Sequence, residues 1–455
     1  MKTVLARLSP QQNLFFGFLL YILIGAVILY LPFSQKTAVG FTDALFMSAS
    51  AVSTTGLATV STFDSFNLFG QGVIALLIQI GGIGYMTFSS FVILSGWQKL
   101  EGWRAKLLNA EFCLPQGFVL RDFLKATIIY TLVIEALGMI ALFIAFKMEG
   151  VETSFALWSS FFHSISSFCT AGFGLYNDSF EQFKHSVPIN AIISILSILG
   201  ALGFIVATDL YYKITRTQHR ITLTTKIIVS VFFGLTSVAT VFMYLYEPSL
   251  QQETGFNAIM IAFFQVMSAI TTVGFNSVPI GNLSTGILLL ITFMMFVGAS
   301  PAGTGGGLKS TTLTAAGATV LSRLRGNLNV FFIGKQIPAE RVSIATSAII
   351  LYTAFIFLGT FLLTCLEPQT VGLEKILFEV ASALGTVGLS TGITGSLCFS
   401  SKLVLILLMY VGRLGVLTFG ISLLQRRQNE GENSPQELAP DAAHTAETDK
   451  ADLVV

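Results

Sequence analysis

The chain has 455 residues, of which 53% are hydrophobic and only 11% are charged, and its formal net charge is +1. Ordinary soluble domains carry roughly 25% charged residues. This composition therefore excludes a typical soluble protein and indicates an integral protein of a lipid bilayer. The net charge says nothing about nucleic acid, and for a membrane protein of this kind we expect no nucleic-acid partner. The four cysteines lack CxxC or Cys/His spacing, so we expect no structural metal or redox site.

Long apolar segments recur along the chain, each close to the roughly 20 residues that span a bilayer as a helix. The first could pass for a signal peptide, but it is long enough to span and no cleavage site follows it cleanly. We therefore expect an all-α membrane protein with eight transmembrane helices. The expected spans are 14–31, 70–94, 124–146, 189–212, 223–246, 284–298, 342–366 and 402–425.

A shorter, Ser/Thr-rich stretch lies between the members of each successive pair of spans. The four stretches align without gaps, with Phe first, Ser four residues later, Thr eight later and Gly ten later. They are too short to cross the bilayer, so each predicts a re-entrant pore helix and loop. The stretches are "FMSASAVSTTGL" (46–57), "FHSISSFCTAGF" (162–173), "FQVMSAITTVGF" (264–275) and "FEVASALGTVGL" (378–389).

A second signature lies inside the long helix after each stretch: "IGGIG" (80–84), "LGALG" (199–203), "VGASP" (297–301) and "VGRLG" (411–415). Two signatures in one order predict four helix, pore loop, helix repeats around a pseudo-fourfold pore. We expect repeat 1 at 1–96, repeat 2 with its preceding cytoplasmic loop at 97–212, repeat 3 at 213–326 and repeat 4 at 327–427. Residues 428–455 form an acidic tail that we expect to be disordered.

Basic residues are distributed unequally between the two sides of the expected membrane protein. The N-terminus, the loops between repeats and the start of the tail carry seventeen Lys and Arg, whereas the pore-helix side carries five, namely Lys36, Lys147, Lys184, Lys375 and Lys402. By the positive-inside rule, both termini are cytoplasmic and the re-entrant loops enter from outside.

The repeated T-x-G-[LF] sequence suits the binding of a dehydrated monovalent cation. Rings of backbone carbonyls replace the hydration shell of such an ion in potassium channels, and glycine lets successive carbonyls point at one axis. A short helix before the loop directs its negative C-terminal dipole towards the ion. The expected selectivity filter comprises Thr54, Thr55, Gly56, Leu57, Thr170, Ala171, Gly172, Phe173, Thr272, Val273, Gly274, Phe275, Thr386, Val387, Gly388 and Leu389.

With these repeats, residues 14–425 resemble the Trk/Ktr/HKT superfamily of potassium transporters. The chain is most similar to the membrane subunit of a bacterial Ktr system, since Trk-type subunits carry two additional N-terminal helices. The resemblance implies potassium uptake across the cell (inner) membrane. Some plant members that transport sodium have serine at the position of Gly56, so the glycine implies potassium selectivity. Whether sodium is also transported or coupled stays open.

The resemblance also implies partners. Ktr-type subunits form homodimers that dock on a cytosolic ring of nucleotide-binding regulatory subunits. This chain has no dinucleotide fold of its own, so we expect no cofactor in it and nucleotide control only through that ring. The basic segments 97–125, 213–226 and 323–341 are candidate docking surfaces.

The run "GASPAGTGGGLKSTT" interrupts the second helix of the third repeat. The resemblance implies that 298–309 is an intramembrane gate loop. A phosphate-binding loop is the alternative, but Leu308 separates Gly307 from Lys309 and the preceding segment is a membrane span, whereas a Walker A motif follows a strand. The expected gate residues are Gly298, Ser300, Pro301, Gly303, Thr304, Gly305, Gly306, Gly307, Lys309 and Arg413.

Arg413 lies about halfway along the last expected span, where a charge costs roughly 2.5–3.5 kcal/mol on insertion scales. One interpretation is structural, an arginine that caps carbonyls of a neighbouring repeat. The other is a positive charge beneath the filter that contacts the gate loop, which the "GR-[IL]-G" context of family members supports. For His163 we expect a structural hydrogen bond, and for Glu379 either a negative field for cations or a buried hydrogen bond.

The alternative function is a secondary transporter of a small solute, built on repeats with broken helices. Such transporters often have inverted repeats, whereas each repeat expected here contains two spans and keeps one orientation. Because each expected repeat contains an even number of spans, all four repeats point the same way, and this favours a pore. No nucleophile and base pair with suitable spacing is present, so we do not expect an enzyme.

Overall fold

The computed structural model describes most of the expected membrane region. It covers residues 10–84, 120–215, 221–298, 300–301, 303–332 and 334–424. The second half of the expected span 70–94, most of the candidate docking segment 97–125 and the tail 428–455 lie outside these residues. The described part is almost entirely helical, apart from one two-stranded hairpin.

Within the described residues, five helices are long and apolar enough to cross a bilayer: α2 (Pro10–Tyr30), α8 (Leu120–Met148), α10 (Val187–Thr215), α11 (Leu223–Tyr246) and α15 (Ala339–Leu366). Leu, Ile and Phe side chains on their outer faces are exposed, as in helices that contact lipid. Helix α15 packs against α14, α16, α17 and α18, and its other side is exposed, as expected for a helix at the edge of the protein that contacts lipid.

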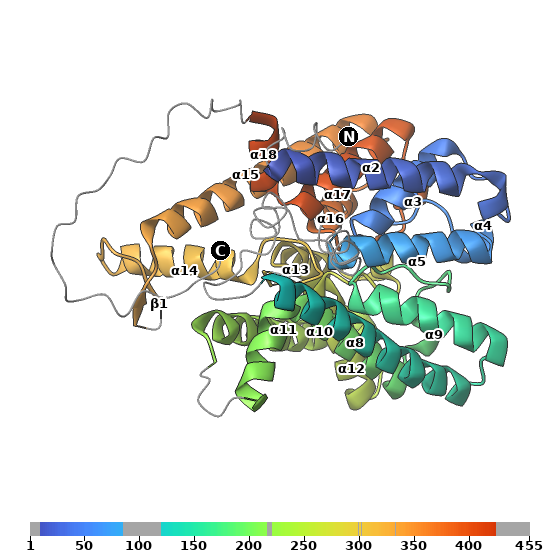
Figure 1. The fold of residues 1–455 in the computed structure, drawn as a ribbon, viewed down its shortest axis with the longest axis horizontal. Helices are drawn as coiled ribbons and strands as arrows, with labels where there is room; N and C mark the ends of the chain where they lie inside the picture. Colours follow the sequence, from blue (N-terminus) through green and yellow to red (C-terminus); the bar gives the residue numbers. More distant parts are fainter. Residues whose placement is uncertain are drawn as a thin grey trace.

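The first and last helices of the chain pack against each other. Figure 1 shows the first helices, in blue, beside the last helices, in orange and red, while the helices coloured teal and green lie together on the other side. Helix α2 contacts α18 (Val416–Leu424), and α3 (Phe41–Val52) contacts α17 (Phe399–Leu414). An ion pair of 2.9 Å joins Lys402 of α17 to Asp43 of α3.

Four shorter helices carry the repeated stretches: α3, α9 (Thr153–Phe168), α12 (Gly255–Thr271) and α16 (Leu373–Gly385). Their shared phenylalanines, Phe46, Phe162, Phe264 and Phe378, are almost completely buried. Each short helix lies against the long helix before it and the helix that follows it. The short connections between these elements contain α4 (Thr62–Ser65), η1 (Pro32–Ser34), η2 (Glu181–Phe183), η3 (Pro248–Gln252), η4 (Ile280–Asn282) and η5 (Thr394–Ser396).

The helix after each short helix ends or bends at one equivalent position. Helix α5 (Leu68–Ile83) ends before Gly84, α10 kinks at Gly203, and α17 is separated from α18 at Gly415 by a bend of 98°. The three glycines have φ values of 89°, 82° and 83°, which side chains other than glycine rarely adopt. In the third copy, α13 (Thr285–Phe296) and α14 (Ser310–Leu324) are separated by a longer loop that contains Pro301.

These breaks correct the expectation of continuous spans at 189–212 and 402–425. They also correct the position of Arg413, which lies in the last turn of α17, two residues before the bend, and not in the middle of a helix. Arg413 therefore lies where backbone carbonyls at a helix end lose their helical partners.

The hairpin of β1 (Phe331–Phe332) and β2 (Lys335–Gln336) connects α14 to α15. Ile337 donates a backbone hydrogen bond to Val330 at 2.8 Å, which closes the base of the hairpin. A small cluster of Val330, Ile337 and alanines of α14 and α15 packs this unit together. Figure 1 shows it projecting from the helical body, at the far end of α14 from the broken-helix region.

Candidate functional site

All four short helices end in the same unusual turn. The threonines of the repeated stretch, Thr54, Thr170, Thr272 and Thr386, have φ values of 52°, 49°, 60° and 47°. The next residue in each copy donates a backbone hydrogen bond of 2.8–3.1 Å to the carbonyl of the repeated serine five positions earlier. This is the helix-ending pattern that usually has glycine at the left-handed position. A β-branched residue there costs about 1–2 kcal/mol, so four in register mark a backbone that the surrounding structure enforces.

The four repeated glycines form a closed ring. A Cβ atom built on Gly56 would lie 2.4 Å from the carbonyl oxygen of Ala171, and one on Gly172 would lie 2.3 Å from that of Val273. The circle continues from Gly274 to Val387 and from Gly388 to Thr55, both at 2.1 Å. All four glycines also have positive φ. Any side chain at these positions would therefore collide with the backbone of the neighbouring loop.

The remaining residues of the four loops line or support this ring. Thr55, Ala171, Val273 and Val387 contribute the carbonyl oxygens that meet the neighbouring glycines. The residues after the glycines, Leu57, Phe173, Phe275 and Leu389, are buried in the apolar clusters around the ring. The hydroxyls of the repeated serines differ in their hydrogen bonds. Ser50 accepts a 3.0 Å bond from the Gly56 nitrogen, and Ser382 accepts one of the same length from Gly388. The hydroxyls of Ser166 and Ser268 have no partner.

On one side the ring opens into a recess of about 360 Å³. All four glycines line it, together with uncharged polar residues such as Asn177, Asn276 and Ser390. Asn276 donates a 2.9 Å hydrogen bond to Glu181, which lies in a loop outside the membrane spans. Partial burial and the nearby charge of Asp178 raise the pKa of Glu181. The wall of the recess thus presents oxygen and amide groups without a fixed charge among the residues that line it.

On the other side, the loop between α13 and α14 contacts three of the four threonines, and Arg413 contacts the first. Thr170 Oγ1 lies 3.1 Å from Thr304 Oγ1, and the backbone nitrogen of Gly306 donates to Thr272 Oγ1 at 3.0 Å. A Cβ atom on Gly306 would lie 2.0 Å from Thr386 Oγ1, so this glycine lets the loop reach the fourth threonine. The first threonine, Thr54, accepts a 3.0 Å hydrogen bond from Arg413.

The break in α10 gives this loop its attachment points. Ser300 donates from its backbone nitrogen to Ala201 at 3.2 Å and from its hydroxyl to Leu202 at 2.5 Å. Thr304 donates to the carbonyl of Gly200 at 3.1 Å. Carbonyls at a broken helix need partners in a membrane. The loop supplies them, and α10 in turn holds the loop against the ring.

Lys309 and the glycines shape the rest of the loop. Lys309 Nζ donates to the carbonyl of Gly305 at 2.9 Å, directly before α14 begins. A Cβ atom on Gly298 would lie 2.1 Å from the Gly306 carbonyl oxygen, and one on Gly303 would lie 2.5 Å from that of Ala201. Gly307 has a φ of 71°. The loop therefore folds compactly upon itself, with helix α13 ending at Phe296 and Pro301 in the turn that follows.

Arg413 connects this loop to the first copy of the repeat. Its guanidinium donates to the Thr304 carbonyl at 2.5 Å, to the Gly82 carbonyl at 3.4 Å and at closer range to that of Gly81. It thus caps carbonyls at the end of α5 and contacts the loop as well. Both kinds of contact expected from the sequence are therefore present, the capping of carbonyls and the contact with the loop, while a role of Arg413 in gating stays a prediction.

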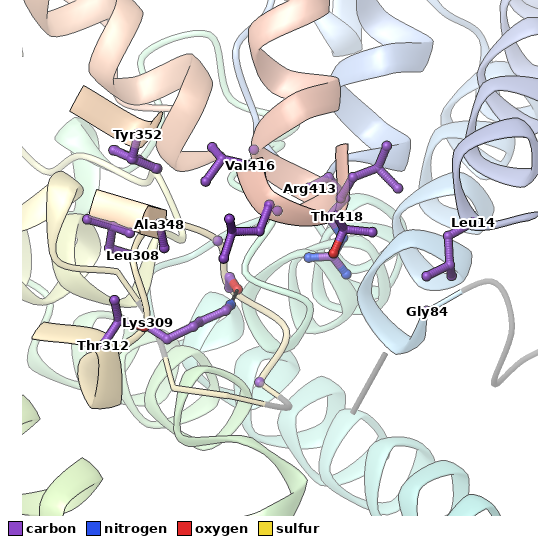
Figure 2. Close-up of a pocket in the computed structure, with 18 of the residues that line it drawn as sticks. Leu14, Gly84, Leu308, Lys309, Thr312, Ala348, Tyr352, Arg413, Val416 and Thr418 are labelled. Atoms are coloured by element: carbon purple, nitrogen blue, oxygen red, sulfur yellow. Dashed lines mark hydrogen bonds between the residues drawn. The ribbon is translucent and has the colours of Figure 1, made fainter. Parts of the chain in front are cut away.

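A cavity of about 270 Å³ lies on the same side as the loop. Figure 2 shows Leu308, Lys309 and Thr312 on one side of it, Leu14 and Gly84 on the other, and Arg413 and Thr418 between them. Two cationic side chains therefore lie in a space that borders the loop, which is unfavourable for a resident cation.

The glycine that comes second in each helical signature has a role that the sequence pattern alone did not reveal. A Cβ atom on Gly81, Gly200 or Gly412 would lie within 2.1 Å of a carbonyl oxygen at the end of a short helix, namely Val52, Phe168 or Leu384. These glycines let the broken helices touch the short ones through their backbones. Only the recurrence of the signature pointed to them.

Comparisons with known proteins agree with this architecture. Residues 17–431 match a family model described as TrkH, cation transport protein. The chain is similar to Ktr system potassium uptake protein B of Bacillus subtilis (strain 168), at 34% identity over 427 residues, covering 93% of this chain and 95% of that protein. Potassium/sodium uptake protein NtpJ of Enterococcus hirae is 33% identical, with coverages of 93% and 94%.

Among solved structures, the potassium transporter TrkH from Vibrio parahaemolyticus has a similar fold. Its TM-score is 0.69 at 23% sequence identity, covering 90% of this chain and 84% of that one. The likeness covers most of the chain. It supports the arrangement of the fold and says nothing by itself about the ion.

Proposed function

We propose, from the premise that this chain belongs to the TrkH family of cation transport proteins, that it takes up potassium through the ring of four glycine loops. The family assignment confirms the resemblance inferred from the sequence, and it makes the chain a membrane cation transporter and not an enzyme. Relatives named as potassium uptake proteins support potassium as the substrate. The observation that carries the proposal is the closed circle of glycine and carbonyl contacts.

In this mechanism the ring is the selectivity filter of four repeats around a pseudo-fourfold pore. An ion enters from the recess of about 360 Å³ and exchanges water for backbone carbonyl oxygens of the loops. The four short helices direct the negative ends of their dipoles towards the ring. No ionised side chain is needed at the narrowest point, in agreement with the uncharged residues at Thr55, Ala171, Val273 and Val387.

The loop 298–309 acts as the gate of this pore. This role is supported by its contacts with Thr170, Thr272 and Thr386 on the side of the ring opposite the recess, and by Arg413, which ties it to the end of α5. A closed gate with an arginine beside it opposes cation passage by steric and electrostatic means. Opening requires the loop to leave its partners on α10.

The assembly follows the Ktr type in this proposal. Relatives carry the name of a Ktr system, which supports further components besides the membrane chain. We expect a homodimer in the cell (inner) membrane, with both termini in the cytoplasm and a cytosolic nucleotide-binding ring as partner. Because one relative is named a potassium/sodium uptake protein, sodium is the second ion to test. A small-solute transporter would not account for the closed glycine ring.

The test is cation flux into proteoliposomes for the wild type, Gly56→Ser and Gly286→Ser. A side chain on Gly56 meets the Ala171 carbonyl, whereas one on Gly286 of α13 meets nothing within 4 Å. We expect Gly56→Ser to lower the ratio of potassium to sodium flux and Gly286→Ser to leave it unchanged. Equal potassium and sodium flux in the wild type, insensitive to Gly56→Ser, would mean that the ring is not the filter.

A further inference from the structure

One register position of the short helices connects three of the four helices to the loop that leaves the ring. The residues one position after the shared phenylalanine are Met47, His163, Gln265 and Glu379, and all four are completely buried. In three copies this side chain is hydrogen-bonded to the residue twelve positions later, which lies three residues beyond the ring glycine. The partners are Leu175, Ser277 and Thr391.

The bonds in the second and third copies are made by uncharged groups. Nε2 of His163 accepts from the backbone nitrogen of Leu175 at 3.2 Å, so Nδ1 carries the proton and donates to the Ser159 carbonyl at 2.8 Å. Gln265 Nε2 donates to Ser277 Oγ at 3.0 Å. Each side chain thus joins the middle of its short helix to the outer flank of its glycine loop.

Glu379 makes the most extensive connection. Its carboxylate accepts from the backbone nitrogen of Thr391 at 2.9 Å, from Ser390 Oγ at 2.6 Å and from Thr394 Oγ1 at 2.8 Å. Of the two roles expected from the sequence, the buried hydrogen bond is therefore the one that the contacts describe. A buried carboxylate without such partners would be strongly unfavourable.

The first copy lacks this connection. Met47 has no group that can replace the imidazole, amide or carboxylate, because a thioether is only a weak acceptor. The residue twelve positions later is Thr59, and its hydroxyl oxygen is buried without a hydrogen-bond partner. Thr59 also lines the recess outside the ring. An unpaired hydroxyl is thus found at the one position where the bridging side chain is absent.

We infer that His163, Gln265 and Glu379 are positioning residues that hold the outer flanks of three of the four glycine loops, and that Met47 leaves the outer flank of the Gly56 loop without this support. The inference rests on the proposed function of the ring as a selectivity filter. A carbonyl ring discriminates between potassium and sodium only while its oxygens keep their number, spacing and orientation. A site whose supporting contacts are missing loses this precision first.

Exchanging residues between copies tests the inference without changing charge. Gln265→Met gives the third copy the residue of the first, and Met47→Gln gives the first copy an amide that can reach Thr59. The measurement is the ratio of potassium to sodium flux in proteoliposomes, with total potassium flux recorded beside it. We expect Gln265→Met to lower the ratio about threefold, as the loss of one ordinary hydrogen bond implies, and Met47→Gln to raise it.

The control is Asn257→Met, an amide-to-methionine change in the first turn of the same helix α12 that we expect to leave the ratio unchanged. A general loss of folding would lower both fluxes together and preserve the ratio, so the ratio separates positioning from stability. If Gln265→Met misfolds, Met47→Gln still decides the matter. Unchanged ratios in both Gln265→Met and Met47→Gln would overturn the inference.

The companion variant Gly56→Ser distinguishes failure of the inference from failure of the proposed function. If Gly56→Ser changes the ratio while the exchanged residues do not, the ring is the filter and the positioning role is wrong. If Gly56→Ser also has no effect, the filter itself has been misplaced and the inference falls with it.

Discussion

At the scale of single residues, Arg413 donates hydrogen bonds to three separate segments of the chain. It donates to Thr54 of the first glycine loop, to Thr304 of the gate loop and to the end of α5. The sequence showed a charge deep in an apolar segment, which marks a functional candidate in membranes. It could not show the partners, because they are 109–359 residues away along the chain.

We expect Arg413→Gln to raise the steady potassium flux about tenfold, because hydrogen bonds to a charged group contribute roughly 1.5–3 kcal/mol and here hold the gate loop in place. The matched control is Arg323→Gln in the last turn of α14, an exposed arginine away from the ring. Flux is measured in proteoliposomes at equal protein content. Wild-type kinetics in Arg413→Gln would limit Arg413 to a purely structural role.

At the scale of elements, the 12-residue repeats correctly located the four short helices, because residues 46–57 and their counterparts combine a helix with a helix-ending turn. The end of α5 before Gly84 and the breaks at Gly203 and Gly415 were not predicted. Glycine is frequent in unbroken transmembrane helices, so hydropathy does not show which glycine breaks one. The break of the third copy was predicted because Pro301 and five glycines add to the signal.

The Thr304 hydroxyl ties the proposed gate loop to the end of α9, so we expect Thr304→Val to increase potassium flux. The change removes the hydroxyl that lies 3.1 Å from Thr170 Oγ1 and 3.1 Å from the Phe168 carbonyl. Thr319→Val is the control, since the Thr319 hydroxyl bonds within α14 to Ala315. A larger change, deletion of residues 302–307, should raise flux further. Unaltered flux in the deletion would contradict the gate assignment.

The contact between broken and short helices predicts a difference between two glycines of long helices. A Cβ atom on Gly200 of α10 would lie 1.9 Å from the Phe168 carbonyl oxygen, whereas one on Gly234 of α11 meets nothing within 4 Å. We expect Gly200→Ala to cost about 1–3 kcal/mol through overpacking and to lower the melting temperature in detergent. Gly234→Ala should melt at or above the wild-type temperature. Equal melting of the two variants would contradict the backbone contact.

At the scale of the whole molecule, the first and last repeats must meet for the ring to close. The contact of Gly388 with the Thr55 carbonyl and the ion pair of Lys402 with Asp43 are the two places where the structure shows this closure most directly. Repeated sequence motifs indicated four equivalent units, but no local pattern states that unit four neighbours unit one. Closure follows from packing four similar units around one axis.

The proposed fourfold arrangement predicts which loops lie on the same side of the membrane. In the proposed topology, the loops after the ring glycines, which include Ser396, lie on one side of the membrane. The hairpin between α14 and α15, which follows Asn327, lies on the other side, as the charge asymmetry of the chain predicts. Both positions are exposed. We therefore expect a membrane-impermeant maleimide to label Ser396→Cys in intact cells and Asn327→Cys only after permeabilisation.

Both cysteine variants are made in a chain whose four native cysteines are replaced by serine, because Cys365 and Cys398 are exposed and would react themselves. The reverse labelling pattern would place both termini outside, and labelling of both positions in intact cells would contradict the assignment of opposite sides.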